Sequence, residues 1–309
     1  MEGFFFRKIL TAENGCFELV RVNLPETLNF ACFMKIKFHF LLLISVVFII
    51  AACNRNNVSK ILKSSDVEYK LRMAEQYYAN KKYSKAQVLY EDLFPVLRSD
   101  PRFEDLYYKY AYCAYYLKDY LSSENLFKGF LDVFPKSQRA PEADYMHAYC
   151  FYKQSPKVDL DQTPTEKTIG YMQAHINNYP ESPKIEEAKK IIESCYEKLE
   201  LKEYKGAELY FNISAYRAAA ISFTNLLNHY PESKRTDEYK LMVIKAYYQY
   251  ANLSIETKQK ERHEKVVEEY YDFVDRFPES KLAKDAEKYF TLAKNSLKNI
   301  NNEQIDKKN

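Results

Sequence analysis

Four short segments with the same pattern, aromatic-Pro-x-Ser, recur along the 309-residue chain and constrain its fold more than any other feature. Pro has no backbone N–H and ends the preceding helix, while a Ser two residues later can accept a hydrogen bond from a free N–H of the next helix as an N-cap. Each tetrad therefore predicts the end of one helix and the start of another. The tetrads are Phe134-Pro135-Lys136-Ser137, Tyr179-Pro180-Glu181-Ser182, Tyr230-Pro231-Glu232-Ser233 and Phe277-Pro278-Glu279-Ser280.

A second spacing repeats upstream of the tetrads. A small residue is followed by an aromatic residue three positions later, a small residue nine after that and an aromatic four further on. This spacing resembles the tetratricopeptide repeat, in which small residues let two antiparallel helices approach closely and aromatics fill the gap to the next pair. We therefore expect an all-α protein, an α-solenoid of about five tetratricopeptide-like helix pairs with a C-terminal capping helix from Leu282 to Leu297. The matching sets are Ala74, Tyr77, Ala86 and Tyr90, then Ala207, Tyr210, Ala219 and Phe223, and in part Ala111, Ala114, Ser123 and Phe127.

Two of the units carry insertions. In the third unit, residues 154–161 intervene before the second helix, whose first residues, Thr163-Pro164-Thr165-Glu166, predict a capping box. In the fifth unit, a similar delay across residues 253–260 predicts a second loop on the same rim. The apolar spacing from Ile185 to Tyr210 predicts that the fourth unit opens with a long helix.

Composition argues against several classes of function. Only three Gly follow Cys53, which excludes the glycine-rich loops that bind phosphates, and the net charge of +3 gives no indication of a nucleic-acid partner. No HExxH motif or shared Cys/His spacing suggests a metal, and no nucleophile and base stand together. We expect no cofactor, no metal site and no catalytic residues, hence a protein that is not an enzyme. The three remaining thiols, which form no CxxC motif, are expected to be buried: Cys113, Cys150 and Cys195.

The N-terminal part predicts export and lipid attachment. An apolar window from Phe38 to Ala52 is too short to span a bilayer as a helix and follows a short cationic segment, as in a signal peptide covering residues 34–52. Ile50-Ala51-Ala52-Cys53 resembles the bacterial lipobox, which implies that Cys53 carries acyl chains such as palmitate. Residues 53–65 read as a flexible tether, 66–299 as the repeat domain and 300–309 as a polar tail. Residues 1–33 lack periodicity and are interpreted as a non-native or misassigned extension before a start at Met34, a genuine cytoplasmic extension being the alternative.

Together, the anchor and the repeats resemble the BamD family of outer membrane protein assembly lipoproteins, over Val67 to Leu297. The resemblance implies a lipid-anchored protein on the periplasmic face of the cell outer membrane. It also implies binding of a BamA-like outer membrane insertase, of unfolded outer membrane barrel proteins and of other assembly lipoproteins, in support of barrel folding and insertion. The C-terminal repeats and the closing helix would dock the insertase, or the helix would merely cover the last repeat. The alternatives are a generic cell-envelope scaffold for cell-wall or division proteins, an enzyme and a carbohydrate-binding lipoprotein.

A stripe of tyrosines accompanies the first small residue of the early repeats. Positions three before, one after and four after that residue fall within an arc of ~60° on a helix of 3.6 residues per turn. In tetratricopeptide folds this stripe faces the concave side, so the resemblance implies a groove for extended, aromatic-rich segments of unfolded clients. The alternative is that these rings pack between repeats. The candidates are Tyr78 near Ala74, Tyr108, Tyr112 and Tyr115 around Ala111, and Tyr145, Tyr149 and Tyr152 around Ala148.

Overall fold

The computed structural model describes the backbone of residues 58–306 and the side chains of residues 58–302. The chain divides into two units, Met1–Ser65 and Asp66–Asn309. In the first unit, residues 58–62 are helical. The predicted extension, the signal peptide at 34–52 and the lipidation site at Cys53 lie outside the described residues. Among the helices that the structure does describe, none has the length and apolar character needed to cross a membrane.

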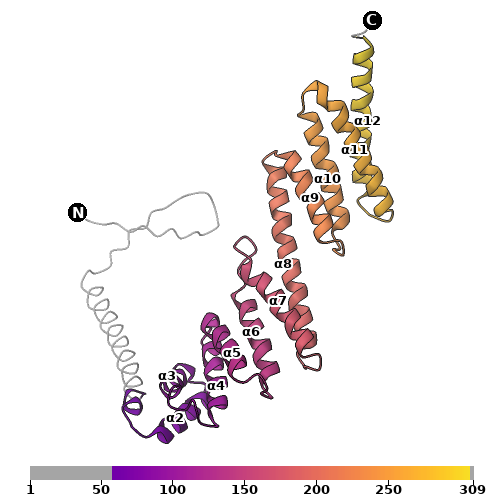
Figure 1. Cartoon of the computed structure of the whole chain (residues 1–309). Coiled ribbons are helices and arrows are strands. Elements are labelled where there is room, and N and C mark those ends of the chain that lie inside the picture. The colour runs from indigo at the N-terminus through magenta and orange to yellow at the C-terminus, as the bar shows by residue number, and fades with distance from the viewer. Residues whose placement is uncertain (1–57, 307–309) are drawn as a thin grey trace, which may run out of the picture. The chain divides into compact units, whose positions relative to one another are not determined.

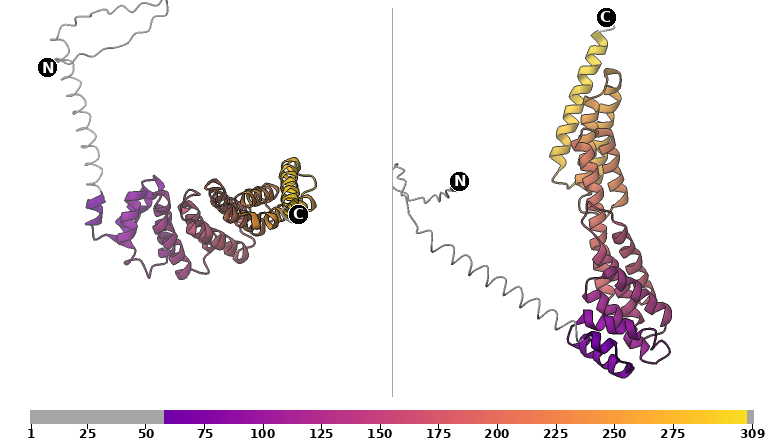
Figure 2. Two further views of the ribbon diagram at one scale, coloured as in Figure 1. Left: turned by 90° about the horizontal axis from the view of Figure 1, so that it is seen from above. Right: turned by 90° about the vertical axis from the view of Figure 1, so that its left-hand side faces the viewer.

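The described part of the second unit contains eleven helices, arranged as five antiparallel pairs and a final single helix (Figure 1). Each helix packs on the next one along the chain, and α12 also packs on α10. The successive pairs stand side by side in Figure 1 and in the left view of Figure 2, which confirms the predicted α-solenoid. The helices are α2 (Val67–Ala79), α3 (Tyr83–Leu93), α4 (Phe103–Tyr116), α5 (Tyr120–Val133), α6 (Ala140–Gln154), α7 (Thr163–Asn178), α8 (Ile185–Asn212), α9 (Tyr216–His229), α10 (Thr236–Asn252), α11 (Glu256–Arg276) and α12 (Ala283–Asp306).

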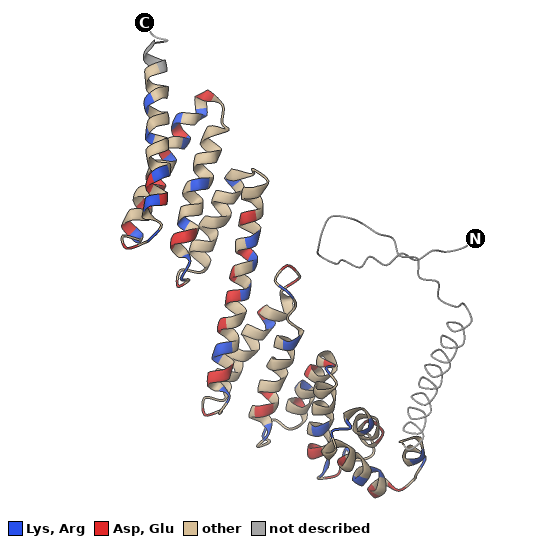
Figure 3. Cartoon of the chain, turned by 180° about the vertical axis from the view of Figure 1, so that it is seen from behind, with Lys and Arg blue, Asp and Glu red and all other residues tan. Residues whose placement is uncertain are grey.

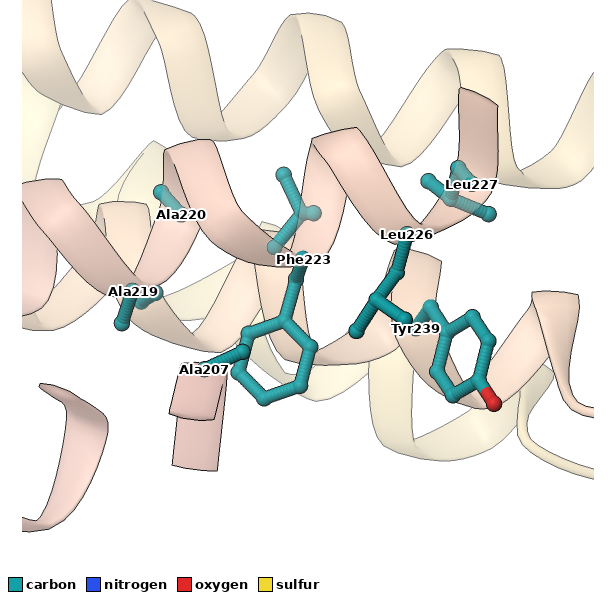
Figure 4. Close-up of a cluster of buried hydrophobic side chains, with 9 residues drawn as sticks. Ala207, Ala219, Ala220, Phe223, Leu226, Leu227 and Tyr239 are labelled. Atoms are coloured by element: carbon teal, nitrogen blue, oxygen red, sulfur yellow. The ribbon is translucent and has the colours of Figure 1, made fainter. Parts of the chain in front are cut away.

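The repeated small and aromatic residues form the core between paired helices. Ala207 and Ala219 are buried where α8 and α9 approach, and the ring of Phe223 lies beside Ala207 (Figure 4). The small side chains permit this approach, and the ring fills the space that remains. Tyr210 is the exception, because it is exposed and Phe211 packs against the cluster in its place.

The connections within pairs one, two and four are tight turns of one kind. Their middle residues, Lys81, Lys118 and Ser214, have positive φ angles of 57°, 64° and 62°. In the second pair, the N–H of Asp119 donates to the carbonyl of Ala114 at 3.0 Å. This is the Schellman arrangement, which satisfies the last carbonyls of a helix and reverses the chain within three residues.

The aromatic-Pro-x-Ser tetrads connect one pair to the next, as predicted, but the Ser is not the helix N-cap. The following helices begin three residues after the Ser, and the cap positions of α6, α8 and α10 make no side-chain cap bond. A tight turn intervenes, in which Ser137 Oγ accepts from the N–H of Arg139 at 2.9 Å and Ser137 O accepts from that of Ala140 at 3.0 Å. Ser137 Oγ also donates to Glu104 Oε1 of α4 at 2.6 Å, so the hydroxyl joins consecutive first helices.

The two insertions differ. Residues 155–162 form the predicted loop between α6 and α7, whereas the loop predicted at 253–260 is wrong, because α11 already begins at Glu256 and the extra residues lengthen α10 and α11. The capping box is wrong as well. Thr163 is the first residue of α7, and Asp161 Oδ2 accepts from its N–H at 3.2 Å.

The predicted long helix is confirmed as α8. The closing helix is α12, which continues past Leu297 to Asp306, so the predicted domain boundary at residue 299 falls inside a helix.

Candidate protein-binding surface

The structure brings the predicted tyrosines of the first three pairs into one continuous network of rings. Tyr78 of α2 contacts Tyr83 of α3 with ring centroids 5.7 Å apart, and Tyr83 stacks on Tyr116 of α4 at 4.3 Å. On α4, Tyr112 contacts Tyr116 at 5.7 Å and Tyr108 at 5.0 Å. We call the complete set the tyrosine surface: Tyr78, Tyr83, Tyr108, Tyr112, Tyr115, Tyr116, Tyr145, Tyr149 and Tyr152.

The network continues from the second pair to the third. Tyr112 contacts Tyr115 at 6.3 Å, and Tyr115 contacts Tyr149 of α6 at 6.2 Å. Tyr149 in turn lies 5.6 Å from Tyr145, on which it stacks, and 5.7 Å from Tyr152. All seven tyrosines singled out from the sequence therefore belong to one surface that three helix pairs share.

The rings are not equally accessible. Tyr112 and Tyr145 are only 8% and 2% exposed, and the hydroxyl of Tyr112 donates to Glu142 Oε1 at 2.5 Å. These two rings pack between repeats, beneath the more exposed rings that they contact. Tyr116 is 45% exposed, and the remaining members are half-buried, so they are the ones that a ligand could touch.

Partial burial raises the pKa of four of these phenols. Burial raises the pKa of Tyr115 to about 12 and raises the pKa values of Tyr78, Tyr108 and Tyr116 above the usual range. A neutral phenol can both donate and accept a hydrogen bond, and its ring offers an apolar face. The tyrosine surface therefore combines apolar contact with adaptable polar contact.

Charged side chains around α4 are paired with one another. Lys109 donates to Glu75 of α2 and pairs with Asp105 at 2.6 Å, and Arg139 pairs with the same Asp105 at 2.8 Å. The guanidinium of Arg139 also lies 4.7 Å from the ring centroid of Tyr108. Because Lys109 and Glu75 are 34 positions apart, the length of one tetratricopeptide repeat, this network fixes the first pair against the second.

On α6, cations lie over the tyrosine rings. Lys153 Nζ is 4.8 Å from the ring centroid of Tyr149 and 5.8 Å from that of Tyr152. Lys184 Nζ is 5.2 Å from the ring of Tyr145. Each cation is attracted by the negative face of a ring, as Arg139 is by the ring of Tyr108.

The sequence interpretation missed Tyr83 and Tyr116, which link the first pair to the second. Neither residue stands at the positions of the predicted arc, because Tyr83 begins α3 and Tyr116 ends α4. Each of the two residues lies next to a tight turn, Tyr83 after the first turn and Tyr116 before the second. The sequence shows these positions, but whether the two rings meet depends on how neighbouring pairs stack.

The structure also contains a hollow that the sequence did not predict. It has a volume of about 880 Å³ and lies between α7, α8 and the turn from α9 to α10, with Ile176, Ile192, Tyr196 and Leu201 among its lining residues. These four side chains come from two helices of different pairs, α7 and α8, which is why spacing within one repeat could not reveal the hollow.

The described residues contain no group of His, Cys, Asp and Glu side chains that could hold a metal ion. The three cysteines are buried and free, as predicted. Burial raises the pKa of Cys113 to about 12 and those of Cys150 and Cys195 to about 11, so these thiols stay protonated and unreactive near neutral pH.

No curated protein matches the chain. Among solved structures, the TPR2AB domain of yeast Sti1, determined in a complex with pHSP90, is 13% identical, with 74% of this chain and 98% of that chain covered and a TM-score of 0.35. A thermophilic TPR protein of Thermus thermophilus is 16% identical over 74% of this chain and 98% of that chain, with a TM-score of 0.27.

The family comparison is decisive. The model of the YfiO family, described as outer membrane lipoprotein, matches residues 66–266. The match begins where the compact unit begins and covers the first four helix pairs, α10 and the first half of α11. It agrees with the resemblance seen in the lipobox and the repeats, and the chain belongs to the YfiO family of outer membrane lipoproteins.

Proposed function

We propose that this lipoprotein is a receptor of the barrel assembly machinery, anchored through Cys53 on the periplasmic face of the outer membrane. The tyrosine surface would bind extended segments of unfolded outer membrane barrel proteins. A BamA-like insertase and other assembly lipoproteins would bind elsewhere on the solenoid, with the last pair and α12 as the candidate dock for the insertase.

The observation that carries this proposal is the continuity of the tyrosine surface. Nine rings from four helices of three pairs form one network. An extended segment needs a long contact surface rather than a closed pocket, since its side chains are spread along the chain. The network has that extended form.

The chemistry suits a ligand whose sequence varies. Tyrosine supplies a large rigid contact area at a low cost in conformational entropy, and its hydroxyl adapts to different partners. Stacking and edge contacts with aromatic residues add about 0.5–1.5 kcal/mol per ring pair. Such a surface favours aromatic-rich segments without requiring one sequence.

The proposal is tested by replacing Tyr115, Tyr149 and Tyr152 with Ser in one variant. These rings are half-buried, so the helices should remain folded, whereas replacing the buried Tyr112 or Tyr145 would damage the packing between repeats. Fluorescence anisotropy measures the affinity for a peptide from the last strand of a barrel protein. In the triple variant this affinity should fall tenfold or more, which corresponds to about 1.4 kcal/mol.

The matched control replaces three exposed tyrosines outside the tyrosine surface, Tyr196, Tyr210 and Tyr271. The control should bind the peptide like the natural chain, and circular dichroism should show the same helicity for both variants. Equal affinity in the two triple variants would refute the tyrosine surface as the binding site.

A further inference from the structure

The turns within the helix pairs carry unusually exposed aliphatic side chains. Leu160 in the loop before α7 is 57% exposed, and Ile213 between α8 and α9 is 61% exposed. Leu253 and Ile255, between α10 and α11, are each 71% exposed, and Leu121 at the start of α5 is 62% exposed. Few other large apolar side chains of the described residues are as exposed as these.

These turns lie on one edge of the solenoid. In Figure 1 the connections from α4 to α5, α6 to α7, α8 to α9 and α10 to α11 follow one another along the upper left of the stack. A planar partner that lies along this edge could therefore contact several of the turns at once. We call it the aliphatic edge: Leu121, Leu160, Ile213, Leu253 and Ile255.

The opposite edge has a different chemistry. It is formed by the Pro-x-Ser tetrads, which are followed by Arg139, Lys184, Lys234 and Lys281. Figure 3 shows charged residues of both signs at these turns. Charged residues such as Asp159, Asp161 and Glu256 occur at the aliphatic edge as well, so the two edges differ in their exposed Leu and Ile side chains, which the tetrad turns lack.

The loop that presents Leu160 is held firmly in place. The buried side chain of Gln162 donates to the carbonyls of Lys157 at 2.8 Å and Leu160 at 3.0 Å. From α8, Lys202 Nζ donates to the same Leu160 carbonyl at 2.6 Å, and Lys205 pairs with Asp159 at 2.8 Å. The backbone is therefore ordered while the Leu160 side chain points into solvent.

The turn between α10 and α11 is built in a similar way. Gln259 Nε2 donates to the carbonyl of Ser254 at 2.9 Å, and Arg262 donates to the Ser254 hydroxyl. The guanidinium of Arg262 lies 3.9 Å from the ring centroid of Tyr250. Leu253 and Ile255 flank this fixed Ser254, with the cation of Arg262 directly behind them.

We propose that the aliphatic edge inserts into the membrane surface, as a second contact beside the lipid anchor. Isolated Leu and Ile side chains on convex turns suit a fluid surface, whereas binding sites for proteins favour Tyr, Trp and Arg and concentrate in packed pockets. Lys202 and Arg262, which donate to these turns, would face the lipid phosphates, whereas Lys205 is paired with Asp159. The family's attachment to the outer membrane keeps such a surface within reach, and in this respect the inference rests on the proposed function.

The chain offers a direct test because it contains no Trp. Leu160→Trp and Leu253→Trp each introduce a single fluorescent residue at the aliphatic edge. Val96→Trp is the matched control, because Val96 is 59% exposed and lies in the connection from α3 to α4, on the opposite edge. The full chain with its anchor is reconstituted into vesicles of phosphatidylethanolamine and phosphatidylglycerol, with and without bromine on the acyl chains.

Membrane insertion should shift the emission of Leu160→Trp and Leu253→Trp to shorter wavelength, and brominated lipid should cause a loss of their fluorescence. Val96→Trp should show neither change. Identical emission of all three variants in both lipids would overturn the inference, as would a shift that appears only after a protein partner is added.

The anchor is tested separately by the mass of the mature chain. An acylated chain without quenching would overturn the aliphatic edge and leave the proposed function standing. A chain without acyl groups whose Leu253→Trp is nevertheless quenched would support the aliphatic edge and refute the proposed anchor.

Discussion

Gly129 on α5 marks a close approach between the helices of the second pair. A Cβ atom at this position would lie 2.2 Å from the hydroxyl oxygen of Tyr107 and 3.3 Å from the ring carbon that bears it. Tyr107 is held by ring contacts with Phe94 at 4.6 Å and Phe130 at 6.0 Å. The glycine is therefore required by packing, although Gly within a helix costs about 1 kcal/mol relative to Ala.

Gly129→Ala should lower the free energy of unfolding by about 1–3 kcal/mol, the usual cost of overpacking. Adding Tyr107→Phe removes the closest atom and should recover most of that loss. Urea denaturation of both variants measures the effect. An increase in stability for Gly129→Ala alone would show that the two helices are not packed this closely.

The raised pKa values of the tyrosines give a dependence on alkaline pH. A tyrosine whose pKa is higher in the folded than in the unfolded state stabilises the fold fully below about pH 10, the pKa of the unfolded residue. This contribution is lost as the pH rises from 10 toward 12, the pKa of Tyr115. Helicity followed by circular dichroism should fall in this range, and Tyr115→Phe should move the midpoint upward. The same midpoint in both proteins would contradict the assignment to Tyr115.

At the scale of single elements, the tight turns each hold a residue with a Cβ atom in a backbone conformation of positive φ, which that atom disfavours. Lys118 has φ of 64°, a conformation that costs a residue with a Cβ about 1 kcal/mol or more and that Gly adopts freely. Lys118→Gly should therefore raise the free energy of unfolding by about 0.5–1 kcal/mol. Thermal and urea denaturation measure the gain.

The neighbouring residue supplies the control. Leu117 has φ of −79°, so Leu117→Gly gains nothing from the turn and should destabilise by about 0.5–1 kcal/mol through the entropy of Gly in the unfolded chain. If both Gly variants were destabilising, Lys118 would not occupy the left-handed conformation.

The elements show how far sequence reasoning reaches. The helix ends at the tetrads, the long α8 and a loop between α6 and α7, expected at residues 154–161, were predicted correctly, because Pro and the spacing of apolar and small residues act on neighbouring turns of helix. The N-cap role predicted for the Ser residues was wrong. The loop expected at 253–260 was wrong, since a break in repeat spacing cannot tell a loop from two longer helices. Residues 256–276 have a polar, strongly helix-forming sequence, rich in Glu and Lys, and continue as α11.

The site follows the same rule. The arc on each first helix identified seven tyrosines correctly as neighbours in space, since that arc depends only on helical geometry. Tyr83 and Tyr116, the burial of Tyr112 and the aliphatic edge depend on how pairs stack on each other. Contacts across pairs join residues about 30–46 positions apart, as between Lys205 and Asp159, and no local pattern specifies them.

Across the whole second unit, the proposed binding surfaces lie on different parts of the solenoid. The tyrosine surface covers the first three pairs, the aliphatic edge follows the turns within the pairs, and α12 packs on the last pair. An extended solenoid allows this separation, because each pair contacts only its neighbours and leaves much of its surface free. The proposed binding of a client, a partner and a membrane surface at the same time requires such a separation.

The most direct test of the client-binding surface is site-specific photo-crosslinking in cells, with the full lipidated chain. A photo-reactive residue in place of Tyr115 should capture unfolded outer membrane barrel proteins, whereas the same residue in place of Tyr196, which is exposed on α8, should not. Capture at position 115 alone is the result expected if the tyrosine surface receives barrel precursors. Absence of any barrel protein at position 115, or equal capture at both positions, would contradict it.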